Sequence, residues 1–215
     1  MSAAPEQELF FIHGPEGPLE ALLETPPSGE LTGGVVVCHP HPQHGGAMQN
    51  KVAHTLARAF VGCGFAALRF NFRGVGRSAG EFAEGEGELL DALAAAGTLQ
   101  ERIGSRELWF AGFSFGAAIA IRAAAKGRVR GLVSVAPAVS RVAQGSDPQP
   151  DCPWLIVQGA KDELVSVNDT VEWVNSLEPG PELQIFEDTE HFFHGKLVML
   201  RKAVESFIKE QRRRT

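Results

Sequence analysis

The sequence lacks the features that mark several large classes of protein. No apolar run approaches the roughly 20 residues needed to span a bilayer, and the first residues carry neither the basic nor the apolar region of a signal peptide. The net charge of −6 argues against a nucleic-acid-binding surface. We therefore expect a cytoplasmic protein that has neither nucleic acid nor a membrane among its partners.

Cysteine is also scarce, and this bears on the compartment. Cys38, Cys63 and Cys152 are odd in number and lie within or beside apolar segments. A disulfide framework needs pairs of cysteines, so buried free thiols in a reducing compartment fit better. The sequence shows no internal repeat and no linker. With 215 residues, 44% of them hydrophobic, the chain can build one sizeable core, and we predict a single domain over residues 1–215.

What the chain does have is a regular alternation of short apolar runs and longer helical segments. Two apolar runs flank residues 14–18, which predicts an opening β-hairpin. The alternation that follows predicts an α/β fold: a mostly parallel, twisted sheet of about eight strands with helices on both faces. We expect the further strands at residues 34–38, 65–70, 107–111, 131–136, 154–158 and 183–186, and the helices at about 48–61, 84–100, 117–125, 170–177 and 196–211.

Glycine-rich and polar stretches follow the predicted strands. In open α/β sheets the binding site lies at the carboxyl ends of the strands, so these stretches are expected to meet at one edge. Their convergence is stronger evidence for a site than any single motif. The stretches are residues 39–46, 71–80, 112–116, 159–163 and 189–194.

The segment Gly112-Phe-Ser-Phe-Gly116 is the most informative of these stretches. It lies between a predicted strand and a predicted helix, where a serine between two glycines suits a sharp turn that exposes its hydroxyl. The following helix directs its N-terminal amides to the same place. This pattern predicts that Ser114 is a nucleophile. The alternative is a tight strand–helix turn with a capping serine.

A serine nucleophile needs a base within hydrogen-bond reach and a third group that orients the base. Asp162 follows the predicted strand at 154–158, and His191 follows the one at 183–186. We therefore expect His191 to be the base and Asp162 the orienting carboxylate. The competing residues are Glu163, Asp169 and Asp188 for the carboxylate and His194 for the base.

The chain resembles the α/β-hydrolase superfamily over nearly its whole length. The resemblance rests on Gly112-Phe-Ser-Phe-Gly116, Gly159-Ala-Lys-Asp162 and Glu190-His-Phe-Phe193, in the order serine, aspartate, histidine that these enzymes use. Residues 39–46 and 69–78 make the chain similar to small serine hydrolases of the dienelactone-hydrolase and short-chain carboxylesterase type. Members with large lids insert them where this chain has only residues 137–153. The resemblance thus implies a single-domain α/β-hydrolase fold with no cap domain and an open site.

The oxyanion hole of such an enzyme needs two backbone N–H donors. One is expected at Phe115, the residue after the nucleophile. The other is expected in the loop after the strand at 34–38, where prolines cannot donate and His41 stands at the position that the resemblance implies. Several apolar residues could line an acyl pocket, with ordinary core packing as the alternative for each: Met48, Phe113, Phe115, Leu164, Phe192 and Phe193.

A group of histidines raises the question of a metal site. His39, His41, His44 and His54 are of a type that binds zinc or nickel. Prolines between the first two oppose regular ligand geometry, and no cysteine or carboxylate pattern accompanies them. We therefore expect neither a metal nor a cofactor, and prefer a tight loop whose polar side chains bond the backbone.

Two arginines in a glycine-rich stretch raise the question of an anion site. Arg73 and Arg77 could hold an acidic substrate or a phosphate, but the stretch lacks the lysine–serine ending of a P-loop. Ion pairing with nearby acids is the preferred interpretation.

The sequence as a whole predicts a serine hydrolase that cleaves small to medium carboxylic esters through an acyl-enzyme. A thioesterase, a lactonase or an acyl-peptide hydrolase with the same three residues is the alternative, because these reactions share one type of tetrahedral intermediate. A binding module with this fold and an unused triad is a third possibility. The expected partner is a small-molecule ester, and either a monomer or a homodimer is compatible with the sequence.

Overall fold

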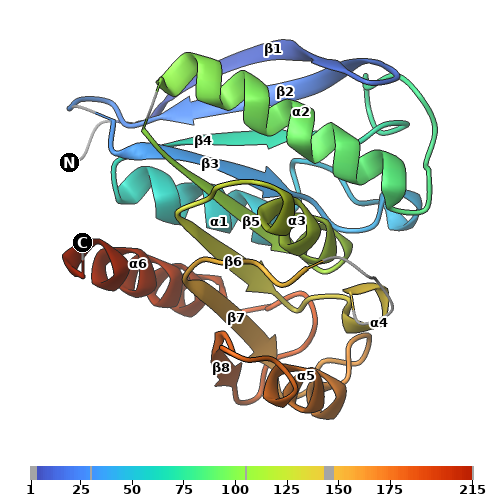
Figure 1. Cartoon of the computed structure of the whole chain (residues 1–215), viewed down its shortest axis with the longest axis vertical. Helices are drawn as coiled ribbons and strands as arrows, with labels where there is room; N and C mark the ends of the chain where they lie inside the picture. Colours follow the sequence, from blue (N-terminus) through green and yellow to red (C-terminus); the bar gives the residue numbers. More distant parts are fainter. Residues whose placement is uncertain (1–3, 30, 105, 143–147, 215) are drawn as a thin grey trace.

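The computed structural model describes residues 4–29, 31–104, 106–142 and 148–214. Its centre is an eight-stranded sheet with the order β1-β2-β4-β3-β5-β6-β7-β8 (Figure 1). The predicted hairpin is antiparallel, as is the pairing of β2 with β4, and the other strands pair in parallel. The strands are β1 (Glu6–Gly14), β2 (Gly17–Thr25), β3 (Gly33–Cys38), β4 (Phe65–Phe70), β5 (Glu107–Phe113), β6 (Gly131–Val135), β7 (Trp154–Gly159) and β8 (Glu182–Phe186).

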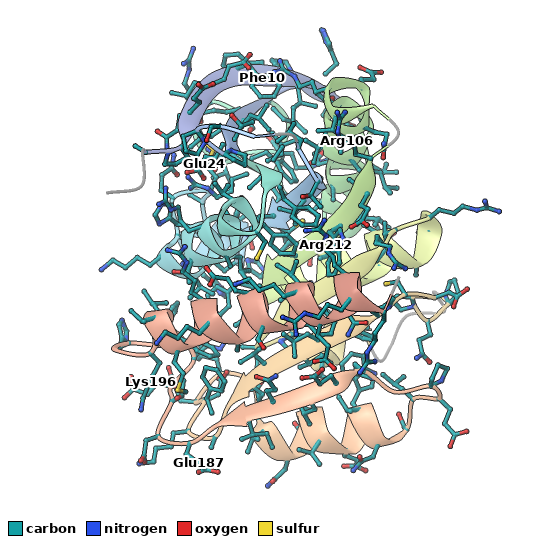
Figure 2. All side chains as sticks on the ribbon, turned by 90° about the vertical axis from the view of Figure 1, so that its left-hand side faces the viewer. Phe10, Glu24, Arg106, Glu187, Lys196 and Arg212 are labelled. Atoms are coloured by element: carbon teal, nitrogen blue, oxygen red, sulfur yellow. The ribbon has the colours of Figure 1, made fainter. Side chains whose placement is uncertain are left out.

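Helices cover both faces of this sheet. Helices α1 (Lys51–Gly62) and α6 (Leu197–Arg213) bury their apolar residues against one face. Helices α2 (Glu86–Ile103), α3 (Phe115–Lys126) and α5 (Val167–Asn175) bury theirs against the other. Figure 1 shows α2 and α3 in front of the sheet, and Figure 2 shows α6 crossing the side turned toward the viewer. The predicted fold class, an α/β-hydrolase fold, is confirmed.

Two helices, α1 and α5, begin where a side chain caps them. Helix α1 begins at Lys51, three residues after the expected start, because the Asn50 side chain accepts hydrogen bonds from two amides of the first turn. Helix α5 begins at Val167, three residues before the expected start, because Ser166 caps it in the same way. Apolar periodicity predicts the two helices, and the caps set their first residues.

Two short helical turns lie at the carboxyl edge of the sheet. The first, η1 (Pro42–His44), follows β3, and the second, α4 (Val139–Val142), follows β6. Only residues 136–153 separate β6 from β7, so the chain carries no cap domain there. In the described part of the chain, every helix is too short or too polar to cross a membrane.

Candidate active site

Ser114 lies on a sharp turn between β5 and α3. Its φ of 56° and ψ of −119° are strained for a residue with a side chain. Neighbouring elements hold the turn in place: the Ser114 N–H donates to Val135 O at 2.9 Å, and the Ser114 carbonyl accepts from the Ala138 N–H at 3.2 Å. The strand, turn and helix expected around the motif are therefore present.

The two glycines of the motif are required by close approach of backbone. A Cβ built on Gly112 would lie 2.3 Å from the carbonyl oxygen of Gly116. A Cβ built on Gly116 would lie 2.3 Å from His39 O and 2.4 Å from Cys38 O. The first turn of α3 thus packs directly onto the backbone that follows β3. This contact brings the residue after Ser114 close to the loop that contains His41.

The side chains of Ser114, His191 and Asp162 form one line of hydrogen bonds. Ser114 Oγ lies 3.1 Å from His191 Nε2, and His191 Nδ1 lies 2.8 Å from Asp162 Oδ2. An Nδ1–H tautomer donates to the carboxylate and leaves Nε2 free to accept the hydroxyl proton. The imidazole is buried, and the rings of Phe113 and Phe192 pack 4.9 and 5.1 Å from it. This packing fixes the ring between the other two groups.

Asp162 is held by hydrogen bonds on both carboxylate oxygens. Oδ1 accepts the N–H groups of Leu164 at 2.9 Å and Val165 at 2.7 Å, while Oδ2 accepts from His191 and from Gln158 Nε2 at 3.0 Å. Burial opposes ionisation, but the hydrogen bonds from His191 and the two amides outweigh it and lower the pKa of Asp162. The carboxylate is therefore ionised at neutral pH.

Gln158 is a residue of this network that the sequence interpretation missed. It is fully buried at the end of β7. Its Nε2 also donates to Val165 O at 3.1 Å, and its Oε1 lies 3.5 Å from Thr170 Oγ1. Gln158 thus connects the loop that holds Asp162 to the strand before it and to α5. The sequence feature that could have indicated this role is a glutamine after the apolar residues of a strand, directly before the loop that contains Asp162.

The competing residues occupy other places. His194 is exposed and does not contact Ser114. Asp188 pairs with Lys161 at 2.6 Å on the surface. Glu163 accepts the backbone N–H of His191 at 3.3 Å, so it supports the loop of the histidine rather than its ring. Of the candidates weighed, the structure brings His191 and Asp162 to Ser114.

The loop after β3 is stiffened by a buried histidine. His39 is fully buried, donates from Nδ1 to Pro40 O at 2.6 Å and accepts the Phe72 N–H on Nε2 at 3.0 Å. Desolvation lowers the pKa of His39 to about 4, so the ring is neutral. Because a trans peptide points its C=O and N–H in opposite directions, holding Pro40 O toward His39 turns the His41 N–H the other way.

The two amides expected to bind an oxyanion are both available. In the described ranges of the chain, the backbone N–H groups of His41 and Phe115 have no acceptor within the protein. The two residues are neighbours, since their rings lie 4.9 Å apart. Free donors on adjoining elements beside a nucleophile suit the stabilisation of developing negative charge.

A cavity of about 560 Å³ opens beside Ser114. One wall comes from the loop after β3 and the start of α3. The rest comes from α4 and the residue before it, and from the segment between β7 and α5 with the first turn of α5. Of the residues predicted to contact substrate, Leu164 lies in this wall and is 65% exposed. The lining residues are His41, His44, Ser114, Phe115, Ala138, Val139, Ser140, Arg141, Leu164, Val165, Ser166 and Asp169.

Of the other residues predicted for the acyl pocket, Phe115 also lines this cavity, whereas Met48, Phe113, Phe192 and Phe193 do not. Met48 is buried, and its N–H donates to Asn71 Oδ1 at 2.8 Å. Phe113 and Phe192 pack on the imidazole of His191, and Phe192 is partly exposed at 41%. Phe113 and Phe192 thus support the imidazole, and contact of Phe192 with substrate stays a prediction. Phe193 is buried beside Phe186.

The histidine and arginine groups have structural partners. The rings of His41 and His44 stack at 4.4 Å, and nowhere in the described residues do three or more His, Cys, Asp or Glu form a group that could hold a metal ion. Arg73 is buried and pairs with Asp91 at 2.8 Å. Arg77 lies over the ring of Phe11. Ion pairing is thus the role of Arg73.

Comparisons with known proteins identify several similar chains. Residues 30–150 match the family model described as serine aminopeptidase, S33. The chain is 39% identical to XC6422 from Xanthomonas campestris, an α/β serine hydrolase without lid, with a TM-score of 0.90 over 95% of this chain and 94% of that one. It is 33% identical to an uncharacterized protein of Rickettsia prowazekii over 93% of this chain and 87% of that protein. A dienelactone hydrolase from Anabaena variabilis shares the fold at 17% identity, with a TM-score of 0.82 over 97% and 99% of the two chains.

Proposed function

This chain belongs to the α/β serine hydrolases without a lid, and we propose that it cleaves small to medium carboxylic esters through an acyl-enzyme on Ser114. The observation that carries the proposal is the line of hydrogen bonds from the Ser114 hydroxyl through His191 to Asp162, with distances of 3.1 and 2.8 Å. This is the arrangement that activates a serine for attack on an acyl carbon.

The chemistry follows from the positions of these groups. Ser114 Oγ attacks the ester carbonyl while His191 Nε2 takes its proton, and Asp162 stabilises the imidazolium that forms. The N–H groups of His41 and Phe115 bind the oxyanion. His191 then gives the proton to the leaving alkoxide, which departs as an alcohol. Water, deprotonated by the same imidazole, attacks the acyl-enzyme, and the acid leaves as Ser114 regains its proton.

The size of the substrate is argued from the cavity. A space of about 560 Å³ without a cap domain above it accommodates a short or medium acyl group. A long-chain lipid needs more enclosed apolar surface than this cavity offers. The cavity wall is mixed, with Val139, Leu164 and Val165 beside polar residues. We therefore favour water-soluble esters as substrates.

A second candidate is the hydrolysis of acyl-peptide bonds. The matching family model is described as a serine aminopeptidase, which favours cleavage of an amide bond over cleavage of an ester. The same nucleophile, base and oxyanion donors serve ester and amide cleavage, so the residues themselves do not separate the two. The leaving group is what differs, because an amine must be protonated before it departs.

The test compares substrates and variants. We expect kcat/KM for p-nitrophenyl acetate to exceed the values for an acyl-CoA and for an acyl-peptide anilide, and Ser114→Ala to lower kcat about 10⁴-fold or more. The matched control is Ser140→Ala, which removes another hydroxyl from the same cavity and is expected to retain activity. Faster cleavage of the anilide would favour the peptidase. Absence of hydrolysis by a folded wild type would favour a binding module.

A further inference from the structure

Arg141 stands in the cavity wall without a carboxylate partner. It lies in α4, whose start is tied to the nucleophile because the Ala138 N–H donates to Ser114 O at 3.2 Å. Its guanidinium carbon is 5.2 Å from the centre of the Phe115 ring, and its Nη2 lies 3.2 Å from His41 Nε2. Among the described residues, Arg141 forms no ion pair. No carboxylate of the described residues therefore neutralises its charge directly.

The contacts of Arg141 hold the guanidinium in place while leaving most of it unused. The Phe115 ring lies against the guanidinium, and His41 contacts one corner of it, so both restrain the group. A guanidinium has five N–H donors, and among the described residues only His41 Nε2 lies within hydrogen-bond distance of one of them. Desolvation and the charges of His44 and Arg141 lower the pKa of His41. At neutral pH Arg141 is thus the permanent cation on this side of the cavity.

We propose that Arg141 binds a carboxylate carried by the substrate, so that the preferred substrates are monoesters of dicarboxylic acids. This inference rests on the proposed ester hydrolysis. The planar guanidinium matches a carboxylate in two parallel hydrogen bonds. The cavity contains Arg141 and Ser114 together, so one substrate can reach both. An alkyl ester without a carboxylate offers no such pair of acceptors, so the remaining donors of Arg141 bond only water.

The other charged groups nearby define which anion fits. Asp169, also in the cavity wall, comes from α5, and Glu84, from the segment before α2, acts on the charge of His41. Neither carboxylate pairs with Arg141 in the described structure. The negative charges of Asp169 and Glu84 near the cavity repel a doubly charged phosphate more strongly than a singly charged carboxylate. A carboxylate is therefore the ligand that the cavity favours.

The first test measures selectivity between matched esters. Monomethyl succinate, glutarate and adipate are compared in a pH-stat with methyl butanoate, pentanoate and hexanoate, in which a methyl group replaces the carboxylate. At low salt we expect the best monoester to exceed its neutral partner about 10-fold or more in kcat/KM, and Arg141→Gln to lower that value about 10- to 100-fold. For the neutral esters, Arg141→Gln should change kcat/KM less than about threefold.

Two controls separate local binding from general charge effects. Arg102→Gln removes an exposed arginine at the far end of α2, paired with Glu8 at 2.8 Å, and should leave both rates unchanged. Asp169→Asn removes the opposing charge and should raise the rate for the monoester. The inference is overturned if wild type favours the neutral ester at all three lengths, or if Arg141→Gln lowers both kinds of ester equally.

The second test does not depend on turnover. In a Ser114→Ala background, binding of monomethyl glutarate is measured by ligand-detected NMR with and without Arg141→Gln. We expect the dissociation constant to rise at least fivefold when the guanidinium is missing. Equal binding would reject the carboxylate site even in an active esterase. Strong binding without any ester hydrolysis would instead support the site and reject the proposed function.

Discussion

At the scale of single residues, the side chains behind Ser114 divide into those that transfer protons and those that hold them in position. We propose that His191 belongs to the first group, and that Asp162 and Gln158 belong to the second. The Gln158 amide donates to Asp162 Oδ2 at 3.0 Å and to Val165 O at 3.1 Å. The carboxylate is therefore oriented from the strand side, while the imidazole approaches from the open edge.

Replacement of Gln158 tests this positioning role. Gln158→Leu removes the donor to Asp162 and leaves Val165 O without a partner, so we expect kcat to fall about 10- to 100-fold with KM little changed. Steady-state kinetics on p-nitrophenyl acetate give both constants. The control is Gln184→Leu, which removes a surface amide whose partner among the described residues is Glu182. A Gln158→Leu enzyme with wild-type kcat would contradict the role.

The sequence predicted the meeting of Ser114, Asp162 and His191 because each follows a strand of a parallel sheet. That argument places residues at an edge, but it says nothing about which other side chains reach them. Gln158 and Arg141 were missed because their roles depend on tertiary contacts: a buried amide under a carboxylate, and a guanidinium stacked on Phe115. The catalytic roles of the three predicted residues stay a proposal until activity is measured.

At the scale of elements, the start of α3 and the loop after β3 contact each other directly and together position the proposed oxyanion donors. Each supplies one of the proposed oxyanion donors, and backbone contacts at Gly116 set their spacing. The sequence indicated the two segments but not how closely they meet. Periodicity reports which face of a helix is buried, whereas this contact depends on the absence of a side chain at one position.

A pair of glycine substitutions tests the spacing. In Gly116→Ala the new Cβ meets His39 O and Cys38 O, which are backbone atoms that cannot rotate away. We expect a loss of about 2–4 kcal/mol in the free energy of unfolding and a kcat at least 100-fold lower. Gly97→Ala in α2 has open space around it and should gain up to about 1 kcal/mol. Urea denaturation compares the two, and equal stabilities would refute the account.

Burial of His39 in the same loop makes the free energy of unfolding depend on pH. The folded-state pKa of His39 is about 4, below the ordinary value of about 6.5. As the pH falls, the unfolded chain therefore protonates this histidine at a higher pH than the folded chain does. The stabilising effect is complete above pH 6.5 and is lost as the pH falls toward 4, by up to about 3 kcal/mol. His39→Asn should therefore show a flatter pH dependence of unfolding over this range. If the free energy of unfolding depends on pH in the same way in the wild type and in His39→Asn, a neutral buried histidine is contradicted.

At the scale of the whole molecule, two apolar cores share one sheet. Trp109 lies in the core under α1 and α6, while Trp154 and Trp173 belong to the core under α2, α3 and α5. The alternation of apolar runs and helical segments predicted this layered arrangement, because strands covered on both faces need helices on both. The number of domains is a separate matter, and we propose that both cores form one cooperative unit.

Unfolding followed at the two cores tests that proposal. Variants that keep either Trp109 alone or Trp154 and Trp173 alone report on opposite faces of the sheet by fluorescence. Because β5, β6 and β7 contribute to both cores, we expect the two signals and far-UV circular dichroism to share one urea midpoint, with each variant compared with its own dichroism curve. Midpoints that differ between the two faces would show that the chain unfolds in parts.

The central claim of this account is that the Ser114 hydroxyl is the nucleophile, and covalent labelling tests it most directly. The folded protein is treated with a fluorophosphonate at neutral pH, and the modified peptide is located by mass spectrometry. We predict a single adduct on Ser114 in the wild type, much slower labelling in His191→Gln, and none in Ser114→Ala. An adduct on another residue, or a folded wild type that stays unlabelled, would contradict the claim.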